Sequence, residues 1–266
     1  MNITEQFKAL QEVKGEGTDK VFTMYLNTDP SDPDQQGGKW KVMLKNGLHN
    51  FERYLKQDEN KEEYKSFLQI KKMVEDYIGE YENQLHKSII FIATKDEVLF
   101  AERLHIRVKS DFYWEEQPRL EQLQQMMDEF PKSGIILVQH DAIKVLETEL
   151  NETQTTQIFE LDVDTEDWKE KVGPRKGFHS SGLGSRNAQI DNFKARFQAN
   201  KHRWYVSVAK SLDQRAKAEK WEKVFIVGET DVSHELANAM KHAVEKVIHK
   251  NMYMQTEAQI MQEIAS

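Results

Sequence analysis

"KSGIILVQHDAIKVLETEL", residues 132–150, decides the fold class of the second half of this chain. Two apolar runs rich in β-branched residues flank the polar pair His140-Asp141, a pattern typical of two strands joined by a tight turn. "TTQIFELDVD" (155–164) predicts a third strand, and "WEKVFIVGE" (221–229) predicts a further strand of the buried type. Together these segments indicate a sheet.

Helices are predicted on both sides of the last of these strands. A long helix begins near Asn187 or Asp191, either of which can cap its N-terminus. Residues 231–249 form a second helix, and a third, short helix lies near residues 256–264. This half of the chain therefore reads strand-strand-strand-loop-helix-strand-helix, an order that buries one face of a sheet under helices.

The first half uses the same kinds of element in another order. A strand at residues 20–30 runs into a loop of aspartate, proline and glycine, and two helices follow, one from Trp40 and a long one over residues 61–86. Residues 88–104 read as strand, turn and strand, and a further helix is entered near Pro118. Helices with one apolar side again indicate a sheet that they cover.

Length and composition allow two units of this kind. We expect an α/β (α+β) fold of two units, at residues 1–131 and 132–266, each a small mixed sheet covered by helices. The chain has no cysteine, which excludes disulfide bonds and cysteine zinc sites. No apolar run reaches the roughly 18 residues of a membrane span. The N-terminal residues lack the apolar core of a signal peptide, so we expect a cytoplasmic protein with no membrane partner.

Charge is distributed unevenly along the chain. The whole chain carries −8, but residues 171–217 contain eleven basic and two acidic residues, so this segment carries +9 and the remainder carries −17. A locally basic element in an acidic protein indicates an anionic partner. The alternative at this point is a solvated helix whose counter-charges come from elsewhere in the fold.

The basic segment divides into a loop and a helix. Glycines and serines over residues 177–187, Gly182 and Gly184 among them, predict a mobile loop, although the consensus of a phosphate-binding P-loop is missing. One side of the helix is apolar and predicts a buried face made of Ile190, Phe193, Phe197, Trp204, Val208 and Leu212. The aromatic residues of this face are therefore predicted to pack in the core rather than to stack on bases.

A second side of the same helix carries a row of cations. Arg196, Arg203 and Lys210 are spaced seven residues apart, which places them on one line about 20 Å long. Such a row matches the spaced phosphates of a nucleic acid, and arginine can contact a phosphate through two hydrogen bonds. Contacts of this kind position a ligand without reading its sequence.

Other chemistry has little support in the sequence. His234-Glu235 begins like a zinc-protease motif, but Asn238 stands where the second histidine is needed. His202 has no sequence neighbours at metal-ligand spacing, and the aspartates of residues 29–34 lack the EF-hand pattern. No serine or cysteine nucleophile motif is present. We therefore predict neither a metal nor a cofactor.

The order "KSGIILVQHDAIKVLETEL…IFELD…loop…Q-x₄-K-x-R-F-x-A-N-K-H-R…A…VFIVG" resembles the central domain of archaeal and eukaryotic peptide-chain release factors and of Pelota. In that domain, three strands lead into a flexible loop that ends in Gly-Gly-Gln, and a basic helix with a Glu-Lys-Arg-His-like stretch follows. The first half, with "VFTMYLNTDP" and residues 88–104, looks like the N-terminal unit of the bacterial members of this superfamily. The group that it most resembles is the Vms-like release factors, and the resemblance covers most of residues 18–245.

The resemblance implies roles for individual residues. Aligning residues 200–203 on the family's basic stretch places Gln189 where the family has its catalytic glutamine, while Asn187 and Ala188 occupy the two glycine positions. In the family, this glutamine enters the peptidyl-transferase centre and positions a water against the ester that joins peptide and tRNA. Two glycines there allow a close backbone approach. Asparagine tolerates the left-handed conformation, but alanine does not adopt it cheaply.

The same resemblance, with the charge pattern, implies the remaining site residues. The loop is expected to gain its flexibility from Gly182 and Gly184, upstream of the glutamine. The residues expected to bind RNA are Arg186, Lys194, Arg196, Lys201, Arg203 and Lys210.

Two functions from different classes stay open at this point. The first is a ribosome-associated peptidyl-tRNA hydrolase that acts in ribosome rescue or quality control without reading a codon. In it, Gln189 orients the water and the cations hold rRNA or the tRNA acceptor arm. The second is a non-catalytic, Pelota-like factor that binds the ribosomal A site in rescue or hibernation, which the missing glycines favour. A third alternative is an unrelated α/β protein that binds RNA or nothing. No DNA partner is predicted, and the sequence identifies no delivery GTPase.

Overall fold

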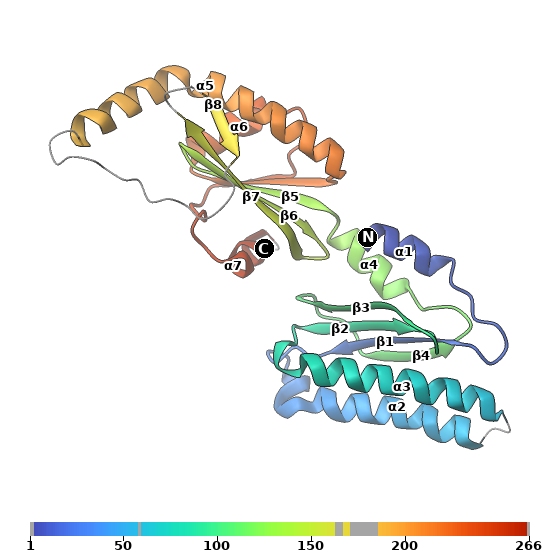
Figure 1. Cartoon of the computed structure of the whole chain (residues 1–266). Coiled ribbons are helices and arrows are strands. Elements are labelled where there is room, and N and C mark those ends of the chain that lie inside the picture. Colours follow the sequence, from blue (N-terminus) through green and yellow to red (C-terminus); the bar gives the residue numbers. More distant parts are fainter. Residues whose placement is uncertain (1–2, 58–59, 163–166, 171–185, 265–266) are drawn as a thin grey trace. The chain divides into compact units, whose positions relative to one another are not determined.

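The structure is a computed structural model that describes residues 3–57, 60–162, 167–170 and 186–264 (Figure 1). The chain divides into two compact units. Unit 1 consists of Met1–Glu129 with Leu150–Glu152, and unit 2 consists of Phe130–Glu149 with Thr153–Ser266. Each unit combines one sheet with helices. The predicted α/β (α+β) class, with two sheets covered by helices, is therefore confirmed.

Unit 1 is built on a four-stranded antiparallel sheet in the order β3-β2-β1-β4. Its strands are β1 (Val21–Asn27), β2 (Ser88–Ala93), β3 (Val98–Leu104) and β4 (Asp111–Glu115). Met24 of β1 lies opposite Phe91 of β2 and Phe112 of β4. Because β1 and β2 are buried along their whole length, their sequences are continuous apolar runs rather than alternating ones.

Two long helices, α2 (Lys39–Gln57) and α3 (Lys61–Tyr81), cover one face of this sheet (Figure 1). Their apolar sides pack on alternate residues of β1 in a core that includes Phe22, Met24, Leu26, Leu44, Leu48, Phe67, Ile70 and Val74. Asn60 caps α3, since its Oδ1 accepts a hydrogen bond from the backbone N–H of Glu63 at 3.3 Å. On the other side of the sheet lie α1 (Ile3–Gln11) and α4 (Glu121–Glu129). The 3₁₀ turns are η1 (Pro33–Gly38) and η2 (Glu82–Gln84).

The structure of unit 1 corrects the sequence prediction in two places. The segment before Pro118 is a strand, β4, and the helix starts only at Glu121. This strand was not predicted, although its Phe-Tyr-Trp run has high β-propensity. Helix α1 was not predicted. It has nine residues, a length that is marginal for an isolated helix and depends on the burial of its apolar side.

Unit 2 is built on a six-stranded mixed sheet in the order β10-β9-β5-β6-β7-β8. Strand β9 is parallel to β5 and β10, whereas β5–β6 and β7–β8 are antiparallel pairs. The strands are β5 (Ser133–Val138), β6 (Ala142–Glu149), β7 (Glu152–Asp162), β8 (Asp167–Glu170), β9 (Lys223–Gly228) and β10 (Lys246–Ile248). The predicted turn at His140-Asp141 joins β5 to β6.

Helices cover both faces of the second sheet. On one face, α5 (Arg186–Glu219) and α6 (Thr230–Ala239) pack on Ile136, Val145 and Ile226. On the other face, α7 (Glu257–Ile264) packs on Leu137 and Val227 through Ile260. The structure describes the side chains of α5 from residue 200 onward. No helix among the described residues is long and apolar enough to cross a membrane.

Unit 2 also departs from the prediction at element ends. The helix predicted over residues 231–249 ends at Ala239, and β10 follows it. The Asp213 carboxylate accepts hydrogen bonds from the backbone N–H groups of Lys241 and His242 at 2.9 Å each, which takes these groups out of the helix. Strand β8 was not predicted. The long helix begins at Arg186, so Asn187 and Asp191 lie inside it rather than at its cap.

Candidate functional site

Helix α5 is held on its sheet by two buried aromatic residues. Trp204 and Tyr205 are 2% and 0% exposed, so Trp204 packs in the core as predicted. The Tyr205 hydroxyl donates a hydrogen bond to the carbonyl of Gln139, just after β5, at 2.9 Å. Trp168 of β8 donates from Nε1 to the carbonyl of Trp204 at 2.9 Å. Burial, followed by the nearby Asp231 carboxylate, raises the pKa of Tyr205, which keeps its hydroxyl a neutral donor.

Ion pairs fix the C-terminal half of α5 on the sheet. Arg215 donates from Nε to Glu147 Oε1 on β6 at 2.6 Å, and the Glu147 side chain is only 4% exposed. Lys132, just before β5, pairs with Glu219 at 3.0 Å. These ion pairs and the buried aromatic residues fix the rotation of α5 on the sheet. The side of α5 that faces solvent is therefore fixed as well.

The outer side of α5 carries cations. Arg203 and Lys210 are both exposed, and seven residues of helix separate them, so they lie on the line that the sequence predicted. Arg203 donates to Asn200 Oδ1 at 3.1 Å, a contact within one turn. Lys217 is exposed and continues the same line. It was not among the predicted residues, although the same seven-residue spacing identifies it. Among the described residues, neither lysine has an ion-pair partner.

Lys201 does not belong to this line. Two residues of helix separate it from Arg203, which places the two about 160° apart around the axis. Lys201 is half-buried, whereas Arg203 is exposed. The two residues therefore cannot contact one stretch of phosphates together. Charge and the resemblance of residues 200–203 to the family's basic stretch grouped them in the sequence, but they lie on different sides of the helix.

The predicted glutamine and its neighbours fall at the N-terminus of α5. Asn187, Ala188 and Gln189 lie in the first turn of the helix, so the structure corrects the expectation that Asn187 and Ala188 are loop residues. Alanine is the strongest helix former, which favours this extension of the helix. Backbone N–H groups of a first turn have no partner inside the helix and point toward its N-terminal end. Gly182 and Gly184 lie outside the described residues.

The backbone of α5 also contains Arg186, Lys194 and Arg196. Arg196 is seven residues before Arg203 and therefore occupies the same line of the helix. Lys194 stands nine residues before Arg203 and occupies the side on which Lys201 lies. The side chains of these three residues lie outside the described part of the chain.

An acidic flank borders α5 on the side of α6. His202 Nδ1 lies 2.6 Å from Glu235 Oε1 on α6, a partner that sequence spacing did not reveal. His140 Nε2, after β5, lies 3.8 Å from Asp231 Oδ2, after β9. Asp231 follows the carboxyl end of β9, and Glu235 lies further along α6 beside His202 of α5. Their negative charge opposes the binding of an anion there.

The chain matches one family model and is similar to a bacterial relative and to two solved structures. Residues 131–266 match the family model described as bacterial archaeo-eukaryotic release factor family 5. An uncharacterized protein of Bacillus subtilis (strain 168), YocB, is 30% identical over 264 residues, which cover 99% of this chain and 98% of that protein. A crystal structure of the archaeal translation termination factor aRF1 aligns at 12% identity and a TM-score of 0.34, over 98% of this chain and 72% of that chain. A structure described as an archaeal protein aligns at 11% identity and a TM-score of 0.32, with the same coverage.

Proposed function

The chain belongs to bacterial archaeo-eukaryotic release factor family 5, and from that membership we propose that it is a ribosome-associated peptidyl-tRNA hydrolase. It acts in ribosome rescue or quality control without reading a codon. Its partners are rRNA and the tRNA acceptor arm, and it works in the cytoplasm. The matched residues include the whole of α5. The assignment to the Vms-like group, which the sequence suggested, stays a prediction.

The observation that carries this proposal is the outward line of cations on a pinned helix. Arg203, Lys210 and Lys217 face solvent while the opposite side of α5 is buried in the core. Cations on a rigid element lose less conformational entropy on binding than cations on a loop. Each phosphate that they neutralise releases counterions, so binding becomes weaker as the salt concentration rises. RNA bound in this way is held by its backbone, which agrees with action that depends on no codon.

The N-terminus of α5 supplies a chemical rationale for hydrolysis. Gln189 lies in the first turn, where backbone N–H groups are free of helical partners and the helix dipole favours negative charge. Attack of water on the ester carbonyl creates an oxyanion, and donors aimed at that oxygen lower the barrier. In the proposed mechanism, the side chain of Gln189 orients the water and the first-turn N–H groups stabilise the oxyanion.

A second function is favoured by one specific observation. The resemblance to the release factors aligns Asn187 and Ala188 with the two glycine positions, and both residues are helical here. A helical backbone with side chains approaches an ester less closely than two glycines do. This favours a Pelota-like factor that occupies the A site without catalysis, in rescue or in hibernation. The two functions share the cation line and differ in whether residues 187–189 support catalysis.

Peptide release separates the two functions. Labelled peptidyl-tRNA in the P site of 70S ribosomes or 50S subunits is mixed with excess protein, and the release of peptide is followed in a single turnover. The wild type is expected to release peptide, and Gln189→Ala is expected to slow release by about 100-fold or more, the effect of losing one oxyanion or water contact. Gln214→Ala, a change of an exposed glutamine on the same helix, is the matched control and leaves the rate unchanged.

The other possible outcomes of this experiment decide between the two functions. Binding of the wild type to ribosomes without release supports the non-catalytic factor and overturns the hydrolase. Release that is equally fast for Gln189→Ala and the wild type keeps the hydrolase but removes the role of Gln189. Absence of both binding and release overturns the proposed function.

A further inference from the structure

Helix α2 of unit 1 is a basic surface helix that the proposed function does not use. In a chain of net charge −8, it has one acid, Glu52, and five basic residues. The five are exposed: Lys39, Lys41, Lys45, Arg53 and Lys56. The apolar residues Trp40, Leu44, Leu48 and Leu55 occupy the opposite side of the helix and are buried. The cations therefore form the solvent side of α2.

Most of this charge is not neutralised within the described part of the chain. Glu52 is occupied by Lys71 of α3, whose Nζ lies 2.7 Å from Glu52 Oε2. The hydrogen bond from Lys71 lowers the pKa of Glu52, which keeps it a carboxylate held toward α3. Lys41 pairs with Glu82. Among the described residues, no acid pairs with the four other cations of α2, at positions 39, 45, 53 and 56.

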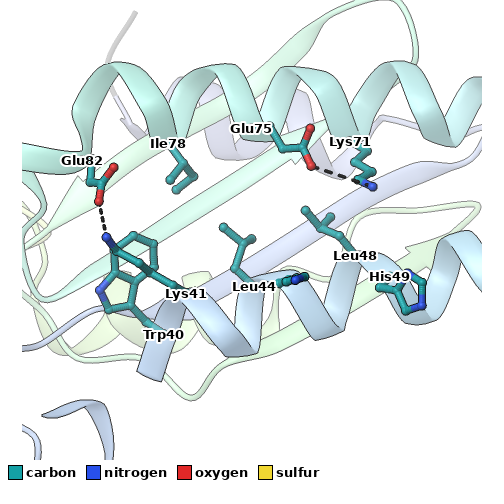
Figure 2. A pocket seen from close by; sticks show the side chains of 10 residues that line it. Trp40, Lys41, Leu44, Leu48, His49, Lys71, Glu75, Ile78 and Glu82 are labelled. Atoms are coloured by element: carbon teal, nitrogen blue, oxygen red, sulfur yellow. Dashed lines mark hydrogen bonds and ion pairs between the residues drawn. The ribbon is translucent and has the colours of Figure 1, made fainter. Parts of the chain in front are cut away.

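A groove of about 410 Å³ runs between α2 and α3 beside these cations (Figure 2). Its floor is apolar and is made by Trp40, Leu44, Leu48 and Ile78. At the rim, Lys41 of α2 pairs with Glu82, just after α3, and Lys71 pairs with Glu75 within α3 (Figure 2). The pairs Lys41–Glu82 and Lys71–Glu52 link α2 to α3 and to the turn that follows α3. Lys45 and His49 line the α2 side of the groove and belong to no ion pair among the described residues.

We propose that the solvent side of α2 is a second RNA-binding surface, which holds the phosphate backbone of structured RNA. Lys41, Lys45 and His49 are spaced four residues apart, so they rise along the helix in steps of about 6 Å. Lys56 extends this row by about 10 Å. In this row, Lys45 and Lys56 are lysines with no ion-pair partner among the described residues. Such lysines on a helix fit a polyanion, and contacts of lysine with phosphates bind without regard to sequence.

The choice of RNA over an acidic peptide rests on the proposed function, because the ribosome presents RNA. The charge pattern supports it as well. The row continues over roughly four turns with Glu52 as its one acid, and that acid faces α3. Binding of a long polyanion by many weak contacts is expected to depend steeply on salt. The same design, cations on the outer side of a pinned helix, is present on α5 of unit 2.

The test uses the full-length protein and a labelled RNA hairpin of ribosomal sequence, titrated by fluorescence anisotropy at several KCl concentrations. Lys45→Glu with Lys56→Glu reverses two cations that have no ion-pair partner in the part of the chain that the structure describes. The expected result is about tenfold weaker binding and a slope of log Kd against log salt that is smaller by about two. Lys8→Glu with Lys14→Glu changes the net charge equally at exposed positions elsewhere in unit 1 and is expected to bind like the wild type.

Three further arms make the result decisive. Thermal melting checks that the α2 variant is folded, and the milder Lys45→Gln with Lys56→Gln replaces it if it is not. The α5 variant, Arg203→Glu with Lys210→Glu, reports on the proposed function separately: loss of ribosome binding there but none for the α2 variants overturns this inference alone. A labelled poly-glutamate peptide that binds as tightly as RNA, and loses binding equally in the α2 variant, overturns the assignment to RNA. Equal effects of the Lys8 and Lys14 pair also overturn it, because net charge would then explain the loss.

Discussion

Arg215 Nε lies 2.6 Å from Glu147 Oε1, and this ion pair joins the C-terminal half of α5 to β6 across 68 residues of sequence. Thr155 donates to the other oxygen of Glu147 at 2.8 Å, so the buried carboxylate has partners on both oxygens. The pair sets the rotation of α5 on the sheet. That rotation is what turns Arg203 and Lys210 to solvent.

Removal of one partner of this pair is expected to destabilise unit 2. Arg215→Met retains much of the buried stem but leaves the Glu147 carboxylate without its cation, which costs about 3 kcal/mol for a buried pair. Urea unfolding followed by tryptophan fluorescence measures the change. Lys210→Met, on the outer side of the same helix, is the control and is expected to alter the free energy of unfolding by less than about 0.5 kcal/mol. Equal stability of the two variants would contradict the anchoring role.

A glycine of β5 reports on the packing of the same unit. A Cβ on Gly134 would lie 2.3 Å from the Trp221 ring, and Trp221 is 3% exposed, so the ring has little room to move. Gly134→Ala is expected to cost about 1–3 kcal/mol by overpacking. Gly79→Ala is the matched change, because nothing lies within 4 Å of its Cβ and it stands inside α3. There alanine is expected to stabilise the helix by about 0.5–1 kcal/mol. Thermal melting is expected to show a lower melting temperature for Gly134→Ala and a higher one for Gly79→Ala than for the wild type.

Asp29 of unit 1 predicts a pH dependence of stability. Burial of Asp29 opposes ionisation, but hydrogen bonds from Ser31 and Arg107 outweigh it and lower the pKa of the carboxyl to about 2, from its ordinary 3.8. Since the folded pKa is lowered, the stabilisation is fully present above pH 3.8 and is lost as the pH falls through 2. The contribution is about 2 kcal/mol.

The measurement is urea unfolding between pH 5 and pH 2. The wild type is expected to lose about 2 kcal/mol more over this range than Asp29→Asn does, because asparagine cannot bind the proton. Asp34→Asn, at an exposed position in the same loop region, serves as the control and is expected to follow the wild type. If Asp29→Asn lost as much free energy of unfolding between pH 5 and pH 2 as the wild type does, the loss would come from other groups.

Particular elements show what the sequence could predict. The strand pairs β2–β3 and β5–β6 were predicted because each consists of two apolar runs around a polar turn. Strand β10 was missed because Lys246–Ile248 is a three-residue strand and no glycine or proline separates it from α6. Strand β8 has four residues and no clear alternation. Short edge elements of this kind depend on their neighbours in the sheet rather than on local pattern.

For the candidate site as well, the sequence predicted features of one helix but not the contacts between distant segments. Periodicity along one helix predicted that Trp204 is buried and that Arg203 and Lys210 are aligned, because both follow from 3.6 residues per turn. Lys201 was grouped with them by charge and by the family resemblance, and it lies on another side of the helix. Contacts between distant segments, such as His202 with Glu235 and Arg215 with Glu147, depend on the tertiary fold. No spacing in the sequence identifies them.

The claim that both proposed functions share is that the chain binds the ribosome through the outer cations of α5. Cosedimentation with 70S ribosomes and 50S subunits over a KCl series tests it most directly. The predicted result is an affinity that falls linearly on a log–log plot against salt. For Arg203→Glu with Lys210→Glu, the predicted result is a loss of at least about tenfold and a slope smaller by about two. Lys8→Glu with Lys14→Glu, which changes the net charge equally, is expected to bind as the wild type does. Equal binding by the α5 variant and the wild type at every salt concentration would contradict the account.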